Sequence, residues 1–122
     1  MIHGLSVHTQ SATSAVGYFL DAKYKDKTTG EWLERDPPAE LIEGDPAQMT
    51  ALCEALRFKH HYTSGVLAFS DDDTAKIAAT PGLKEKLIEE LREFAYAGVK
   101  QDDCKQLLVV EHGHKGNLEL HY

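Results

Sequence analysis

The sequence lacks the features that would place the protein in a membrane or in an oxidising compartment. No apolar run approaches the ~18 residues that a membrane-spanning helix needs. The N-terminal stretch MIHGLSVHTQSATS has neither the basic nor the apolar segment of a secretory signal. The two cysteines, Cys53 and Cys104, form no CxxC motif and no disulfide framework. We therefore expect a reduced, cytoplasmic protein with no membrane partner.

Positive charge is also scarce. The 122 residues include 13 Lys and Arg against 20 Asp and Glu, which gives a net charge of −7 with histidine neutral. This balance argues against a histone-like protein that binds polyanions non-specifically, but it allows an enzyme whose basic groups are local. Apolar and charged fractions of 42% and 27% exclude wholesale disorder. The length suits a single domain over residues 1–122.

The hydrophobic pattern predicts an α+β fold. Asp45, Pro46 and Gln48 form a strong helix start, with an N-cap side chain, proline at N1 and a capping-box glutamine. The polar segment 23–38, which contains Gly30 and two prolines, indicates a loop. Strands are expected at 5–8, 62–69, 106–111 and 118–122, and helices at 15–20, 46–57, 74–79 and 81–97. This order favours an antiparallel sheet with helices packed on one face.

The C-terminal hairpin carries a candidate metal site. Glu119 and His121 are two residues apart on a predicted strand, so their side chains point to the same face. A glycine-containing turn can bring His112, at the end of the preceding strand, beside that pair. Two imidazoles and a carboxylate form a plausible three-ligand site for a divalent ion, with His114 as a possible fourth ligand. The alternative is a polar surface strand without a metal.

The same residues resemble a known family. VEHGHKGNLELHY resembles the metal-binding motif of plasmid mobilisation relaxases, which are HUH-type single-strand endonucleases. It is closest to the colicin-plasmid branch, whose pattern is His, six residues, Glu, one residue, Asn. LIEGDPAQMTALCEAL and FKHHYTSGVLAFS are similar to the front of that branch, so the resemblance extends from about residue 15 to residue 122. In this match His112 and Glu119 are the first two ligands, His121 replaces the usual Asn, and His114 stands where Asp is frequent.

The resemblance implies a fold, an activity and a nucleophile. The fold is an HUH/RRM-like palm, and the activity is the nicking of one DNA strand at an origin of transfer with Mg²⁺ or Mn²⁺. A tyrosine hydroxyl attacks the scissile phosphate and leaves a 5′-phosphotyrosyl intermediate. In the family this tyrosine lies near the N-terminus on a helix over the sheet, which indicates Tyr18, with Tyr24 as the alternative. Tyr62 is expected to be structural, and Tyr122 to point away from His121.

The resemblance also implies single-stranded DNA as partner, with possible accessory mobilisation proteins. Relaxase domains are longer than this chain, so residues 1–122 would be a partial or a compact relaxase domain, and an exposed sheet edge could support a homodimer. Trp32 could stack on a base, although we expect it to cover the core. Two rival functions are an inactive relaxase-like binding module and an unrelated His/Glu metallo-hydrolase. The candidate phosphate-binding residues are Lys23, Lys25, Lys27, Arg57, Lys59 and His60.

Overall fold

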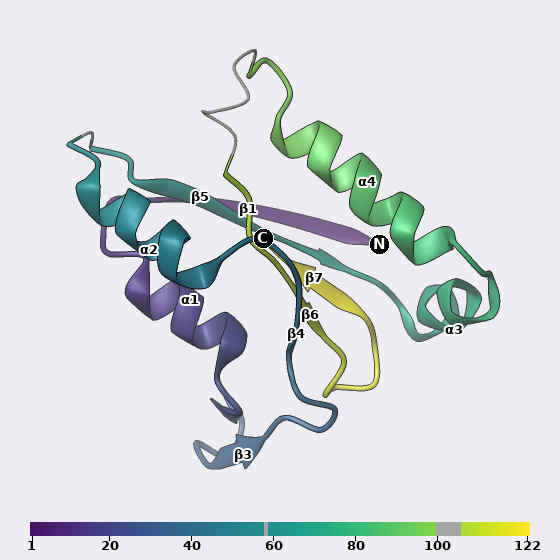
Figure 1. The fold of residues 1–122 in the computed structure, drawn as a ribbon. Helices are drawn as coiled ribbons and strands as arrows, with labels where there is room; N and C mark the ends of the chain where they lie inside the picture. Colours follow the sequence, from purple (N-terminus) through teal and green to yellow (C-terminus); the bar gives the residue numbers. More distant parts are fainter. Residues whose placement is uncertain (58, 100–105) are drawn as a thin grey trace.

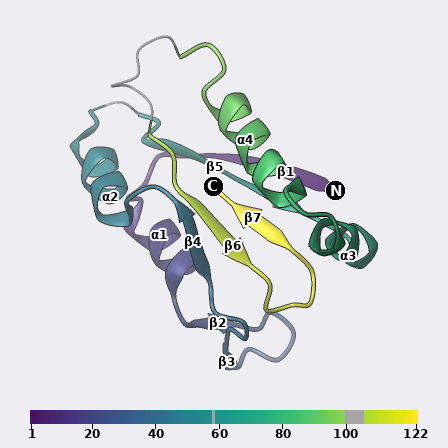
Figure 2. The same ribbon diagram turned by 45° about the vertical axis from the view of Figure 1, so that its right-hand side comes forward.

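A five-stranded antiparallel sheet forms the centre of the protein (Figures 1 and 2). The computed structural model describes residues 1–57, 59–99 and 106–122. Within these residues the strand order is β1-β5-β7-β6-β4, and each neighbouring pair is antiparallel. The strands are β1 (Ile2–His8), β4 (Glu40–Glu43), β5 (Tyr62–Ala68), β6 (Val109–His112) and β7 (Glu119–His121). The predicted α+β class with an antiparallel sheet is confirmed.

Of the four helices that the structure describes, two begin at a side-chain cap. The four are α1 (Thr13–Leu20), α2 (Pro46–Ala55), α3 (Asp71–Ala79) and α4 (Leu83–Ala95). Asp45 Oδ1 accepts a 3.0 Å hydrogen bond from the Gln48 amide, as expected for the cap of α2. Ser70 Oγ accepts from the Asp73 amide at 3.1 Å, and three aspartates occupy the first turn of α3. This cap and the helix dipole explain why α3 begins at Asp71, three residues before the predicted start.

Strand β6 is packed on both of its faces. Val109 and Val110 are both fully buried, and they belong to different hydrophobic clusters. Val109 packs in the cluster that contains Ile77 of α3 and Leu91 of α4. Val110 packs with Phe19 of α1 on the opposite side. Thus α3 and α4 cover one face of the sheet, and α1 and α2 lie on the other side, which the sequence did not predict (Figure 1).

The segment 23–38 is not a plain loop as predicted. It contains a hairpin of β2 (Lys23–Lys25) and β3 (Trp32–Glu34), which pair with each other and not with the main sheet. Asp26 Oδ1 accepts from the Thr28 and Thr29 amides and closes the turn, and Gly30 follows with φ 72°. The expectation that Trp32 covers the core was wrong. Its side chain is 67% exposed, because the hairpin stands apart from the five-stranded sheet.

Several other boundaries differ from the predicted ones. β1 begins at Ile2 rather than residue 5, and β6 includes His112. β4 was missed, because its sequence ELIE has charged ends and only two apolar residues. Cys53 is buried on α2, whereas Cys104 lies outside the described residues. Over residues 1–57, 59–99 and 106–122, no helix has the length and apolar character needed to cross a bilayer.

Candidate metal and tyrosine site

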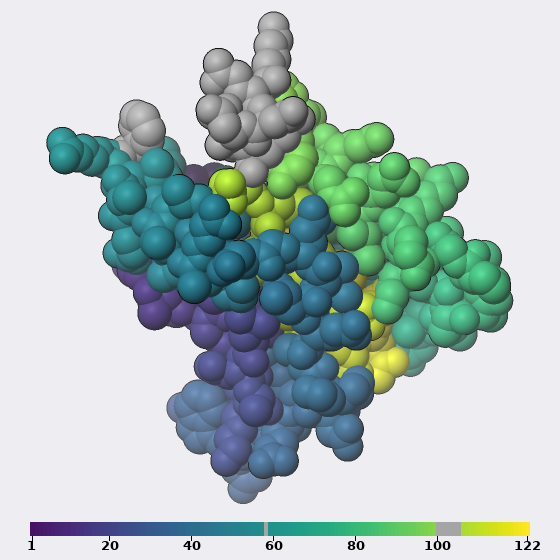
Figure 3. All heavy atoms as spheres, viewed as in Figure 1, coloured from purple at the N-terminus to yellow at the C-terminus, as the bar shows by residue number. Residues whose placement is uncertain are grey.

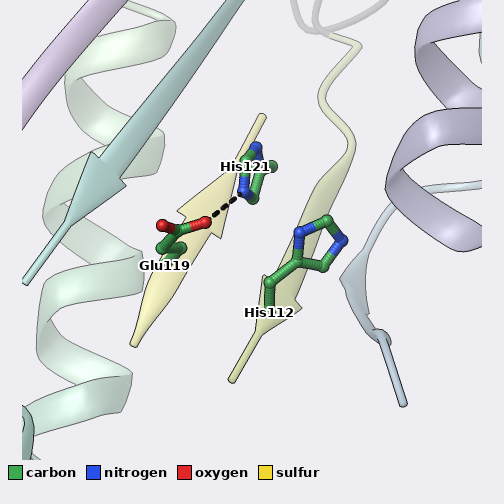
Figure 4. A group of neighbouring side chains, drawn as sticks. All are labelled: His112, Glu119 and His121. Carbon is green, nitrogen blue, oxygen red and sulfur yellow. Dashed lines mark hydrogen bonds and ion pairs between the residues drawn. The ribbon is translucent and has the colours of Figure 1, made fainter. Parts of the chain in front are cut away.

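The register of β6 and β7 brings the three predicted ligands together. His112 lies opposite Glu119, and Val110 lies opposite His121, so all three polar side chains emerge on one face of the sheet. One potential ligand atom from each of these residues lies within 4.8 Å of the other two (Figure 4). His112 and His121 are only 1% and 8% exposed. This His-Glu-His group, His112 with Glu119 and His121, could hold a metal ion.

Glu119 and His121 already contact each other. The Nε2 atom of His121 lies 3.0 Å from Oε2 of Glu119 (Figure 4). This hydrogen bond is the main cause of a lowered pKa of Glu119, and burial acts in the opposite direction. The carboxylate is therefore ionised at neutral pH and provides the negative charge that a divalent cation requires.

The ring of His112 presents one nitrogen to the group and the other to α1. Its Nε2 lies 2.6 Å from the carbonyl oxygen of Phe19, and its Nδ1 is buried with no partner among the described residues. In Figure 4 one ring nitrogen faces His121 and Glu119, and the other points away from them. Burial lowers the pKa of His112 from 6.5 to about 4. The imidazole is therefore neutral at pH 7, and Nδ1 is its free donor atom.

Tyr18 lies over the same group. Its ring centroid is 6.0 Å from that of His112 and also 6.0 Å from that of His121. The next residue, Phe19, packs into the cluster with Val110, which fixes α1 against this side of the sheet. Tyr18 remains 49% exposed. The candidate nucleophile therefore lies between solvent and the two imidazoles.

Tyr24 and His114 lie beside the group rather than in it. The Tyr24 ring, on β2, is 4.4 Å from the His114 ring, which is in turn 5.5 Å from the His112 ring. His114 is not among the residues whose donor atoms meet within 4.8 Å. Its pKa is lowered, mainly by burial. Tyr24 is therefore the more distant of the two candidate tyrosines from the His-Glu-His group.

Arg35, directly after β3, is a site residue that the sequence did not reveal. It is 4% exposed, and its guanidinium lies 5.0 Å from the Tyr18 ring centre and 5.9 Å from that of Tyr24. Its Nη1 is 3.1 Å from the Phe19 carbonyl oxygen and 2.8 Å from His112 Nε2. A single arginine after a polar stretch carries no pattern that predicts burial. Only the path of the hairpin brings it under the two tyrosines.

Arg35 and Phe19 compete for the same nitrogen of His112. With its proton on Nε2 the imidazole donates to the Phe19 carbonyl, and Nδ1 keeps a free lone pair. With its proton on Nδ1 the ring accepts from Arg35 and has no lone pair for a metal at that atom. A metal held through Nδ1 would therefore require the first tautomer, in which the Phe19 carbonyl orients the imidazole.

The predicted phosphate-binding residues form two separate clusters, and every one is exposed. The β2–β3 hairpin carries one cluster, and the connection between α2 and β5 carries the other. These segments lie at opposite ends of the α1 and α2 side (Figures 1 and 3). The hairpin carries Lys23, Lys25 and Lys27, and the connection carries Arg57, Lys59 and His60. Tyr24, between Lys23 and Lys25, contacts His114, which in turn contacts His112, so the hairpin cluster lies near the His-Glu-His group.

The other two tyrosines named in the sequence lie elsewhere. Tyr62 stacks on His8 at 4.5 Å between ring centroids, on paired strands β5 and β1. Tyr122 packs over Gly65 with the α3 and α4 core and hydrogen-bonds to His3. Tyr122 is thus on the face opposite His121.

Sequence comparisons identify relatives of the chain. It is 32% identical over 84 residues, 69% of its length, to DNA relaxase MbeA of Escherichia coli. It is 34% identical, over the same share of its length, to cryptic plasmid protein C of Neisseria gonorrhoeae. The chain spans 15% of the first relative and 38% of the second. No protein-family model and no solved structure matches it. The chain is related by sequence to plasmid mobilisation relaxases.

Proposed function

We propose that the chain is a relaxase domain, partial or compact, that nicks one DNA strand at a plasmid origin of transfer. The observation that carries this proposal is the position of Tyr18 over His112 and His121. A tyrosine hydroxyl near neutral pH is a weak nucleophile, since its unperturbed pKa is ~10. A cation bound at the neighbouring His-Glu-His group would favour its attack. The relationship to a DNA relaxase supplies the substrate class.

The proposed reaction is a transesterification. The Tyr18 oxygen attacks the scissile phosphorus and forms a new phosphotyrosyl ester. The bond from phosphorus to the 3′ oxygen breaks. The tyrosine proton is released, and the leaving 3′ oxygen takes up a proton to become a free hydroxyl. The nicked strand thus remains attached to the protein through its 5′ phosphate, and Tyr24 is the alternative nucleophile.

The donor set fits a divalent metal ion. His112 Nδ1 is a buried nitrogen without a partner in the described part of the chain, His112 is neutral at pH 7, and Glu119 is ionised. We assign His112, Glu119 and His121 as ligands and keep His114 as a possible fourth. The carboxylate favours Mg²⁺ or Mn²⁺, and the imidazoles favour Mn²⁺ of the two. Such an ion would offset the negative charge that builds on the phosphate oxygens.

Single-stranded DNA is the proposed partner. The exposed lysines of the hairpin would contact backbone phosphates next to Tyr24, and the second basic cluster would contact a more distant part of the strand. We also propose accessory mobilisation proteins and a second copy of the chain as possible partners. Strand β1 offers a free edge for a second copy, with Ile2, Leu5 and Val7 all at least half exposed. Action on plasmid DNA would be consistent with the cytoplasmic location that we propose.

A labelled oligonucleotide tests the activity. We would incubate the chain with Mn²⁺ and single-stranded oligonucleotides tiled across origins of mobilisable plasmids, then separate the products on a denaturing gel. A 3′-end label should move with the protein, whereas a 5′-end label should appear on a shorter free fragment. A metallo-hydrolase or an inactive binding module would give no labelled protein.

Matched variants test the nucleophile. Tyr18→Phe should abolish the labelled band, and Tyr24→Phe should retain it. Tyr62→Phe is the control, because this ring stacks on His8 in the β1 and β5 pair. Retention of the band in Tyr18→Phe would contradict the assignment.

A further inference from the structure

We propose that Arg35 is an anion-binding residue that receives a phosphodiester of the DNA strand beside the His-Glu-His group. This proposal rests on the proposed function, since it names the group of the same substrate that Arg35 holds. It assigns a role to a residue that the sequence did not reveal.

The guanidinium of Arg35 has hydrogen-bonding capacity that the described residues do not use. Arg35 is 4% exposed, yet its Nε and Nη2 atoms are buried without a partner in residues 1–57, 59–99 and 106–122. Within these ranges only Nη1 has hydrogen-bond partners, the Phe19 carbonyl oxygen and His112 Nε2. When His112 carries its proton on Nε2, only the Phe19 carbonyl remains as an acceptor. Two of the three guanidinium nitrogens are thus free to receive a ligand.

The positive charge of Arg35 is also unbalanced. Among the described residues Arg35 forms no ion pair, whereas Arg92 and Lys84 pair with Glu43 and Glu111. The end of α1 offsets only part of the charge, through a single carbonyl. A buried, unpaired charge is costly, so an anion with two acceptor oxygens would complete this site. Guanidinium binds phosphate oxygens in a bidentate manner.

The position of Arg35 indicates that the bound anion is a phosphodiester. Arg35 touches His112 directly, and the Tyr18 ring packs on its guanidinium. An anion held there would lie next to both the candidate nucleophile and the candidate ligands. In the proposed reaction that anion is the phosphate at or beside the nick. The interaction fixes the phosphate against Tyr18 whether or not a metal is bound.

The hairpin controls access to this site. The free nitrogens of Arg35 have almost no exposed surface, and Tyr24 of β2 lies near the guanidinium. Among the described strands, β2 and β3 pair only with each other, so a shift of the hairpin would break no pairing within the five-stranded sheet. The anion therefore enters when the Tyr24 side of the hairpin shifts away from Arg35.

Side-chain NMR of a 13.6 kDa protein gives a direct test. In metal-free buffer, ¹⁵N-labelled protein would be titrated with dimethyl phosphate, an anionic diester, or with neutral trimethyl phosphate. The Arg35 Nε–H resonance, identified by its loss in Arg35→Met, should shift saturably with the anion only. Chloride at equal ionic strength should leave it in place. A resonance unmoved by dimethyl phosphate, or moved equally by chloride, would overturn the proposal.

Affinity for single-stranded DNA without metal gives the second readout. Arg35→Met should weaken binding on the order of tenfold, the usual effect of losing a charged hydrogen bond, and Arg35→Lys should restore part of it. Lys86→Gln, at an exposed position of α4, is the matched control for a lost surface charge. Tyr24→Ala should leave dimethyl phosphate binding intact or stronger, because it uncovers Arg35. Equal affinity of Arg35→Met and wild type would contradict the proposal.

The two proposals can fail separately. Formation of the labelled covalent band without any response of Arg35 to dimethyl phosphate would reject the role of Arg35 alone. A response of Arg35 without a covalent band would reject nicking by this chain and leave the anion site in place.

Discussion

Acidification from pH 7 to pH 5 should destabilise the protein through the buried imidazole of His112. Its pKa is about 4 in the folded chain, against 6.5 when unperturbed. Between these values the unfolded chain binds a proton that the folded chain does not, so stability increases with pH across this window. Integration of the two titrations gives a loss of about 2 kcal/mol on going from pH 7 to pH 5. Below pH ~4 the loss of unfolding free energy relative to pH 7 is complete, at about 3 kcal/mol.

Urea denaturation in metal-free buffer at pH 5, 6 and 7 measures this effect. His112→Gln, which cannot titrate, should show a smaller loss of unfolding free energy by about 2 kcal/mol over the same range. The lowered pKa of His114 contributes in the same direction, but it is present in both proteins and cancels in the comparison. His60→Gln, at an exposed position, should follow the wild type. Equal pH dependence of wild type and His112→Gln would show that the buried imidazole of His112 does not cause this loss of stability.

Two further predictions concern the metal and the core. Mn²⁺ at one hundred times its dissociation constant should stabilise the native protein by about 2.7 kcal/mol, and the double variant His112→Ala with His121→Ala should lose this gain. An unchanged melting shift in the double variant would reject the ligand set. Gly65→Ala should destabilise by 1–3 kcal/mol in order of magnitude, because its Cβ would lie 2.7 Å from Cε1 of Tyr122. Gly4→Ala, whose Cβ would lie 3.5 Å from its nearest neighbour, is the control, and equal losses in denaturation would contradict this account.

The local parts of the fold could be predicted from the sequence. Glu119 and His121 alternate with apolar residues, and glycines mark the turn before them. These local signals predict that the two side chains meet His112 on one face, and the register of β6 and β7 agrees with this prediction. The cap by Asp45 is equally local. Such features are encoded within a few residues, so pattern and turn chemistry suffice for them.

The long-range parts could not be predicted. Arg35 is buried because the β2–β3 hairpin directs it beneath Tyr18, which is seventeen positions earlier in the sequence. The sequence pattern does not show where a polar segment packs, and segment 23–38 was predicted to be a loop. The position of α1 opposite α3 and α4 depends on Val109 and Val110 facing two cores. Their consecutive apolar side chains are typical of a strand buried on both faces, but they do not show which helices cover each face.

Mass spectrometry of the protein–DNA adduct identifies the tyrosine that becomes linked to the DNA. Trypsin separates the two candidate nucleophiles, since the first basic residue is Lys23 and Tyr24 begins the next peptide. After reaction with a single-stranded origin oligonucleotide and Mn²⁺, followed by nuclease trimming, we expect a nucleotide on Tyr18 within peptide 1–23. The adduct should be absent without metal and absent in the His112→Ala, His121→Ala double variant. A nucleotide on Tyr24, or on Tyr18 without dependence on those histidines, would contradict this expectation.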